Sequence, residues 1–208
     1  MYSLYYFPAK GRAQQIRLAL AEADQDWVEE QCDFARFRSL KAENSFPYGQ
    51  LPVLDVTDIE GSDSTVRLAQ CPAIVEYIAL RHGLISDDLI ARQQALAHTL
   101  AAEDFRGLLY KVVFAGSDEA KARELENLQQ NGGPRWLSTF SRLLEGKEYL
   151  LGQFSYCDLA VYDALTFAGD VLGASFLNDY PTIVSFIERV GSRPKVATFL
   201  ASDKCPKQ

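Results

Sequence analysis

The pattern of apolar residues changes once along this chain, near residue 80, and this change limits the possible folds more than any other feature. Before it, short runs with the alternation of a β-strand are interspersed with stretches of helical periodicity. After it, apolar residues recur at helical spacing and no further strand pattern is found. We therefore expect an α/β domain at residues 1–81, followed by an all-helical domain at residues 86–208.

The first domain is expected to contain a small sheet with both parallel and antiparallel neighbours. Strands are predicted at residues 2–6, 27–30, 52–56 and 65–68 and helices at 12–23 and 72–80, whereas 34–42 fits a helix or an irregular loop. The last two strands flank DIEGSDS at residues 58–64, whose turn-forming residues predict an antiparallel hairpin. The order is βαβ followed by ββα, which fits a mixed sheet covered by helices.

The second domain is expected to consist of helices joined by short loops. They are predicted at residues 87–114, 118–130, 135–144, 155–172, 180–190 and 195–201, with NGGP at 131–134 as a break. The segment SYCD, at residues 155–158, begins the fourth of these helices. Ser-x-x-Asp before an apolar helix is a capping box, in which the two side chains accept from backbone N–H groups at the helix start. We therefore give SYCD a structural role.

Composition and charge argue against several functional classes. The formal net charge of −7 does not fit a nucleic-acid footprint or an anionic membrane surface, and no apolar run reaches the length of about 18 residues that spans a bilayer. The cysteines (Cys32, Cys71, Cys157 and Cys205) are far apart and only two histidines occur, so no CxxC pair or metal-ligand spacing is found. The start has no secretory signal pattern, and we expect a cytoplasmic location with free thiols.

The stretch YYFPAKGR, at residues 5–12, raises the first functional question. Two tyrosines precede a proline and a basic, glycine-containing turn where a strand meets a helix, although Val or Ile would satisfy packing there. We interpret this junction as the place of a chemical group and not only as core.

Two further segments could contact a ligand. In Leu51–Pro52 a proline begins a strand, and a cis bond would expose the Leu51 backbone to an extended peptide, although an ordinary trans bond is commoner. At residues 68–72 a strand ends and a helix begins, so unpaired amides and the helix dipole favour a carboxylate, to which Gln70 adds an amide donor. Simple capping of the turn would explain Gln70 and Cys71 equally well.

Together these segments resemble the cytosolic glutathione transferases over nearly the whole chain, most closely the pi class and next the sigma class. The resemblance is carried by the order and spacing of YFPAKGR (6–12), YGQLPVL (48–54), LAQCPAI (68–74), AEDFR (102–106), SYCD (155–158) and RPKVATFLAS (193–202). It implies a thioredoxin-like N-terminal domain, an all-α C-terminal domain and a homodimer. It also implies glutathione as co-substrate, an apolar electrophilic small molecule as second substrate, and no metal.

The resemblance assigns the catalytic role to Tyr6, at the position of the tyrosine that donates to the glutathione sulfur. Strand alternation supports Tyr6, because Tyr5 then faces the other side of the sheet and is expected to be core. A free thiol has a pKa of about 8.5, and a hydrogen bond to its anion lowers that pKa. A phenol can thus stabilise the nucleophilic thiolate without a metal or an acid–base pair.

The resemblance implies further contacts for both substrates and for the dimer. The expected glutathione-binding residues are Arg12, Phe37, Lys41, Gln50, Leu51, Pro52, Gln70, Cys71 and Asp104, the last supplied by the partner subunit to face the ammonium group. The expected electrophile pocket contains Phe7, Tyr110 and Phe114, and Tyr48 is expected to insert into the partner subunit.

This chain departs from the family pattern at three positions. Cys71 replaces a serine and is a poorer hydrogen-bond donor, so it either weakens binding slightly or offers a reactive thiol at a helix start. Phe37 is the nearest aromatic residue to a missing tryptophan and lacks the indole N–H. Phe114 replaces a tyrosine, which makes acid assistance to the electrophile doubtful.

Three functions therefore fit the sequence. The first is conjugation of glutathione to apolar electrophiles, a detoxification reaction. The second is a non-catalytic ligand-binding or structural protein on the same fold, since a fold does not determine a function. The third is a glutathione-dependent isomerase of the prostaglandin synthase type.

Overall fold

The computed structural model describes residues 1–57, 59 and 64–207. These residues form two compact units, Met1–Leu84 together with Pro194–Gln208, and Ile85–Arg193. The division after Leu84 lies between the two domain ranges that the sequence suggests. The C-terminal segment, however, belongs to the first unit.

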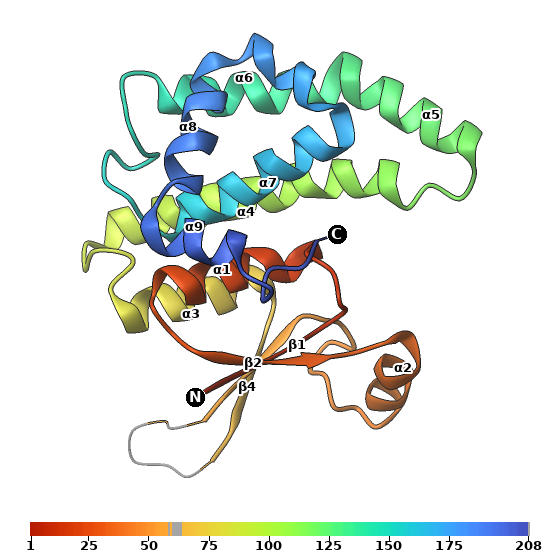
Figure 1. The fold of residues 1–208 in the computed structure, drawn as a ribbon, viewed down its shortest axis with the longest axis vertical. Helices are drawn as coiled ribbons and strands as arrows, with labels where there is room; N and C mark the ends of the chain where they lie inside the picture. Colours follow the sequence, from red (N-terminus) through yellow and green to blue (C-terminus); the bar gives the residue numbers. More distant parts are fainter. Residues whose placement is uncertain (58, 60–63, 208) are drawn as a thin grey trace. The chain divides into compact units, whose positions relative to one another are not determined.

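The first unit is a four-stranded mixed sheet with helices (Figure 1). Its strands are β1 (Tyr2–Tyr6), β2 (Trp27–Gln31), β3 (Val53–Val56) and β4 (Val66–Ala69), and its helical segments are η1 (Gly11–Ala13), α1 (Gln14–Glu22), α2 (Phe34–Ala42), α3 (Cys71–His82) and α9 (Pro194–Ala201). The strand order is β2-β1-β3-β4, with β2 parallel to β1 and the other neighbours antiparallel. The predicted mixed sheet is thus confirmed. Most of the turn predicted in DIEGSDS lies outside the described residues.

The two faces of β1 have different surroundings. Tyr2 and Leu4 are buried, and the Tyr2 hydroxyl lies 2.7 Å from Nε2 of His82 on α3. Tyr5 points to the opposite face, where the guanidinium carbons of Arg36 and Arg67 lie 5.8 and 4.7 Å from its ring centroid. Tyr5 is therefore half-buried between two cations, which corrects the expectation that it belongs to the core. An aromatic ring attracts such cations through its electron-rich face.

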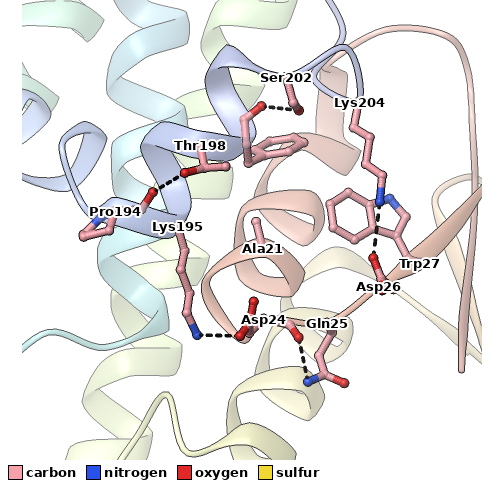
Figure 2. Close-up of a pocket in the computed structure, with 11 residues that line it drawn as sticks. Ala21, Asp24, Gln25, Asp26, Trp27, Pro194, Lys195, Thr198, Ser202 and Lys204 are labelled. Atoms are coloured by element: carbon pink, nitrogen blue, oxygen red, sulfur yellow. Dashed lines mark hydrogen bonds and ion pairs between the residues drawn. The ribbon is translucent and has the colours of Figure 1, made fainter.

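The C-terminal segment is held to the first unit beside the end of α1. The rings of Phe199 on α9 and Trp27 on β2 meet edge to face, with centroids 5.7 Å apart. Both residues line a cavity of about 440 Å³, and Figure 2 shows this cavity with Trp27 labelled. Two exposed lysine–aspartate pairs line this cavity: Lys195 with Asp24 at 3.5 Å and Lys204 with Asp26 at 3.4 Å. Exposed ion pairs contribute little, so the buried aromatic contact is the main attachment.

The second unit is helical throughout its regular elements. They are α4 (Leu89–Val113), α5 (Asp118–Asn127), the π-helical turn η2 (Leu128–Gly132), α6 (Gly133–Leu144), α7 (Tyr156–Leu172), the 3₁₀ segment η3 (Ala174–Asp179) and α8 (Pro181–Gly191). The break predicted at NGGP is instead this π-helical turn, from which α6 starts directly. A Cβ at Gly133 would lie 2.9 Å from the Leu128 carbonyl oxygen, so the tight turn needs a glycine there.

A buried carboxylate at the start of α7 ties two segments of the second unit together. Asp158 Oδ2 accepts from the Ser155 backbone N–H at 2.8 Å, and Oδ1 accepts from the Leu150 N–H at 3.0 Å. The first contact belongs to the capping box predicted from SYCD, which is present. Burial raises the pKa of Asp158 to about 6, although the two N–H groups oppose this shift.

We expect Asp158→Ala to lower the free energy of unfolding by at least about 2 kcal/mol, because it leaves two buried N–H groups without their acceptor. Chemical denaturation at neutral pH, followed by circular dichroism, measures this loss. Asp170→Ala removes an exposed carboxylate from the same helix and should change stability by less than about 0.5 kcal/mol. Equal losses in the two variants would contradict a capping role for Asp158.

Candidate functional site

The hydroxyl of Tyr6 lies against the turn that joins β1 to α1. Its oxygen accepts a hydrogen bond from the Arg12 backbone N–H at 2.9 Å. Gly11, just before it, has a φ of +42°, and a Cβ there would lie 2.4 Å from Tyr6 Oη. Only glycine both tolerates this left-handed backbone and allows such a close approach. Within the segment AKGR, Gly11 and Arg12 therefore lie directly against the Tyr6 hydroxyl.

A buried arginine, Arg17 on α1, supports the same turn from inside. Its guanidinium donates to the carbonyl oxygens of Ala9 and Lys10, at 2.9 and 3.2 Å, and lies 5.9 Å from the Tyr6 ring centroid. Glu29 on β2 pairs with it at 2.7 Å, which offsets the cost of burying the charge. Sequence reasoning missed Arg17. The signal was a charged residue between Ile16 and Leu18 in an otherwise apolar stretch.

The environment of Tyr6 keeps its phenol protonated at neutral pH. Burial raises the pKa of Tyr6 above its usual value, and the Arg12 N–H and the charges of Arg12 and Arg17 oppose this increase. Because the oxygen already accepts from Arg12, the hydroxyl proton is directed to another acceptor. Tyr6 is therefore suited to donate a hydrogen bond and not to act as a phenolate base.

The junction of β4 and α3 brings Cys71 to the same turn. The Cys71 thiol is 4% exposed and donates to the Arg12 carbonyl oxygen, with Sγ and O 3.3 Å apart. Gln70, the N-cap residue of α3, has a φ of +70°, which is uncommon for a residue with a side chain. Its Nε2 lies 3.4 Å from Oε1 of Gln50, so the amide side chains of two loops meet here.

The Leu51–Pro52 bond, for which both isomers fitted the sequence, is cis. Lys41 lies close to the loop before that bond: a Cβ at Gly49 would be 3.2 Å from Lys41 Cε. Lys41 lies on helix α2, so residues 34–42, which fitted either a helix or an irregular loop, are helical. Its N-cap residue Asp33 accepts from the Arg36 N–H.

Aromatic side chains pack between α2 and the start of the β1–α1 turn. The Phe7 ring lies 5.1 Å from that of Phe34 and 5.5 Å from that of Phe37, which also stacks on Phe46 at 5.9 Å. Lys41 Nζ is 5.7 Å from the Phe37 ring centroid. Phe37 is therefore a packing residue of this cluster, and Phe34 and Phe46 are members that the sequence interpretation did not include.

The remaining predicted site residues lie elsewhere. Asp104 is exposed on α4 of the second unit. On the same helix the Tyr110 ring stacks on that of Phe114, with centroids 5.4 Å apart, and lies tilted against that of Phe167 at 5.1 Å. Phe114 is 76% exposed at the end of α4. Tyr48, in the loop before β3, is 66% exposed.

Metal-ligand clusters and membrane-spanning helices are absent from the described part of the chain. Among those residues, no group of three or more His, Cys, Asp or Glu side chains is arranged to hold a metal ion. No helix there combines the length and the apolar character needed to cross a bilayer. None of the four cysteines, all of which the structure describes, forms a disulfide, and all are buried: Cys32, Cys71, Cys157 and Cys205.

Comparison with known proteins gives consistent matches. Residues 103–203 match the family model described as "Glutathione S-transferase, C-terminal domain". Glutathione S-transferase P of Capra hircus is 30% identical, over 97% of this chain and 92% of the relative. A glutathione S-transferase structure from Ascaris lumbricoides superposes with a TM-score of 0.85 at 23% identity, over 100% of this chain and 98% of the other. A structure described as rat hPGDS complexed with a quinoline reaches 0.84 at 25% identity, over 100% and 98%.

We expect Gly11→Ala to displace the Tyr6 hydroxyl, because the added methyl would occupy the space 2.4 Å from Tyr6 Oη. NMR of protein labelled at the tyrosine ζ-carbon should show a changed Tyr6 shift and titration. Gly83→Ala is the matched control, since Gly83 also has a positive φ, of +70°, but nothing lies within 4 Å of its Cβ position. If both variants leave the Tyr6 signal unchanged, the close contact at Gly11 does not position this hydroxyl.

Proposed function

Because the chain belongs to the glutathione S-transferase family, we propose that it transfers the glutathione thiolate to apolar electrophiles and that the Tyr6 hydroxyl stabilises that thiolate. The observation that carries the proposal is the hydrogen bond from the Arg12 N–H to Tyr6 Oη, at 2.9 Å. It orients the phenol oxygen and leaves the phenol proton for a sulfur acceptor. The curated relatives that match the chain are P-class, or pi-class, transferases, and the protein is accordingly a transferase enzyme.

The proposed chemistry depends on the protonation states of two groups. Glutathione binds as a thiol whose usual pKa is about 8.5, so most of it is unreactive at neutral pH. The raised pKa of Tyr6 keeps its proton in place for donation to the sulfur. Donation favours the anion and lowers the thiol pKa, and the released thiol proton goes to solvent. The thiolate then attacks the electrophile, and the protein holds the two reactants together.

The residues of the first unit fit glutathione, which has two carboxylates and one ammonium group. We assign the glycyl carboxylate to Lys41, the cysteinyl backbone to Gln50 and the Leu51–Pro52 segment, and the γ-glutamyl carboxylate to Gln70 and the backbone amides that begin α3. Helix N-termini favour such anions. The ammonium group would face Asp104 of the partner subunit.

The proposed electrophile pocket and dimer contact also follow from membership of the glutathione S-transferase family. Phe7, Tyr110 and Phe114 form the proposed electrophile pocket, in which Phe114 has no hydroxyl and cannot assist a leaving group as an acid. Aromatic anchors are typical of protein interfaces, and the exposed Tyr48 is proposed to insert into the partner subunit of a homodimer. Detoxification in the cytoplasm is the corresponding physiological role.

A second candidate is a glutathione-dependent isomerase that returns the thiol after reaction. The likeness to the structure named rat hPGDS, at a TM-score of 0.84 and 25% identity, favours this candidate. The thiolate site would be the same in both cases, and only the electrophile pocket would differ. Mass spectrometry distinguishes them, because an isomerase leaves the amount of free glutathione unchanged while a transferase consumes it.

We expect Tyr6→Phe to lower kcat/KM for conjugation of glutathione to a chloronitrobenzene by about 10- to 100-fold at neutral pH. A hydrogen bond to a charged group contributes about 1.5–3 kcal/mol, and this variant removes one from the thiolate. The loss should diminish at higher pH, where more of the thiol ionises without help. Tyr5→Phe is the control on the opposite face of β1, with no expected loss. A Tyr6→Phe enzyme with the wild-type rate and pH profile would disprove the role of the phenol.

We expect Lys41→Ala to raise KM for glutathione by about fivefold with little change in kcat, since an exposed charge pair contributes about 1 kcal/mol. Steady-state kinetics at varied glutathione concentration measures both constants. Arg38→Ala removes a second exposed cation from α2 and should leave KM within about twofold. Equal effects of the two substitutions would mean that Lys41 acts only through the general charge of α2.

A further inference from the structure

Cys71 contacts the residue that orients Tyr6. Its thiol donates to the Arg12 carbonyl oxygen, with a separation of 3.3 Å, while the Arg12 N–H donates to Tyr6 Oη at 2.9 Å. The carbonyl oxygen of Arg12 is thus bonded to Cys71 on α3, and its N–H group is bonded to the Tyr6 phenol. Gln15 Nε2 on α1 also donates to the Arg12 carbonyl oxygen, at 3.5 Å, so the particular effect of the Cys71 bond is to tie this carbonyl to α3.

The turn that contains Arg12 needs such an anchor. η1 is only three residues long, it begins at Gly11 with a φ of +42°, and its N-cap residue makes no side-chain hydrogen bond. A short turn of this kind has little rigidity of its own. By contrast, α3 has twelve residues and is buried along Ile74, Val75 and Ile78. A bond from α3 therefore transfers the rigidity of a packed helix to the turn.

We propose that Cys71 is a positioning residue for the thiolate site: its thiol fixes the Arg12 backbone and so keeps the Arg12 N–H on the Tyr6 hydroxyl. The proposal rests on the function proposed above for Tyr6, but the geometry on which it depends exists without glutathione. It also explains the substitution chemically. A small, largely apolar thiol is suited to a position that is 4% exposed.

This role changes how the γ-glutamyl carboxylate is recognised. The Cys71 S–H is directed to Arg12 and not to the ligand, so the carboxylate depends on the backbone amides of α3 and on Gln70. The two possible roles of the Cys71 thiol, contact with the ligand and positioning of Tyr6, predict different kinetic effects of its removal. The first changes KM for glutathione, whereas the second changes the pH dependence of the thiolate.

The ionisation of Tyr6 reports the positioning effect directly. The titratable and charged groups that face Tyr6 are Arg12 from η1, Arg17 from α1 and Cys71 from α3. Negative charge on Cys71 raises the pKa of Tyr6 and the Arg12 N–H lowers it. Removing the thiol should therefore lower the Tyr6 pKa if only charge matters, and raise it if the Arg12 bond is loosened.

The decisive comparison is Cys71→Ala with Cys71→Ser, because both lack the thiolate and only serine keeps a donor. In ligand-free protein labelled at the tyrosine ζ-carbon, we expect the Tyr6 pKa to be about 0.4 to 1 unit higher in Cys71→Ala, the equivalent of one neutral hydrogen bond. The Tyr6 signal is assigned by its absence in Tyr6→Phe. Equal pKa values in the two variants would overturn the proposal. Cys71→Val, which retains packing without a donor, replaces the alanine variant if that does not fold.

The same pair of variants is then tested with glutathione. The apparent pKa of kcat/KM should be higher in Cys71→Ala than in Cys71→Ser, with similar KM for glutathione. In a Tyr6→Phe background this difference should vanish, because the two residues act through one bond. A rise in KM without a shift of the pH profile would overturn the proposal in favour of a direct ligand contact.

The control is Cys32→Ala, which removes another fully buried thiol of the same unit that donates to a backbone carbonyl, that of Glu30. It should leave the Tyr6 titration unchanged, and an equal shift there would show a general effect of lost packing. An inert wild-type enzyme would contradict the proposed function alone. The ligand-free titration would still decide the positioning role.

Discussion

The hydrogen bond between the Arg12 N–H and the Tyr6 hydroxyl is the interaction on which the site depends. It joins the end of β1 to the start of the first helix, and three other features are arranged around it. Gly11 allows the turn to touch the phenol, Arg17 holds the carbonyls of that turn, and Cys71 bonds to the Arg12 oxygen. Each contributes a backbone or buried contact, so the position of the hydroxyl does not depend on exposed, mobile side chains.

This arrangement places a protonated phenol where an anion can be stabilised. A partly buried phenol resists ionisation, and its oxygen already accepts a hydrogen bond from one N–H group. The remaining function of such a group is to donate a proton in a hydrogen bond, which is what a thiolate acceptor requires. The groups that would bind the rest of glutathione come from other loops. Gln50 and Gln70 meet at 3.4 Å, and Lys41 lies along Gly49.

Local patterns predicted most of the secondary structure. Alternation along β1 and the Ser-x-x-Asp capping box depend on neighbouring residues only, and both are present. Failures occurred where distant residues meet. Tyr5 was expected in the core, but Arg36 and Arg67 reach it from α2 and β4. At NGGP two helices were correctly separated, and the structure adds that the connection is a π-helical turn that leads directly into α6.

By itself, the sequence determined the order of strands and helices, the family resemblance and the identity of Tyr6 as the candidate phenol. These depend on periodicity and on short motifs, which are properties of adjacent residues. Only the tertiary structure decided what the Cys71 thiol contacts, why Gly11 is needed, that Arg17 supports the turn, and that the C-terminal segment packs with the first unit. The physical reason is that a hydrogen bond or a close contact depends on distances of a few tenths of an ångström. Residues such as Arg12 and Cys71, 59 positions apart, reach those distances only when the chain is folded.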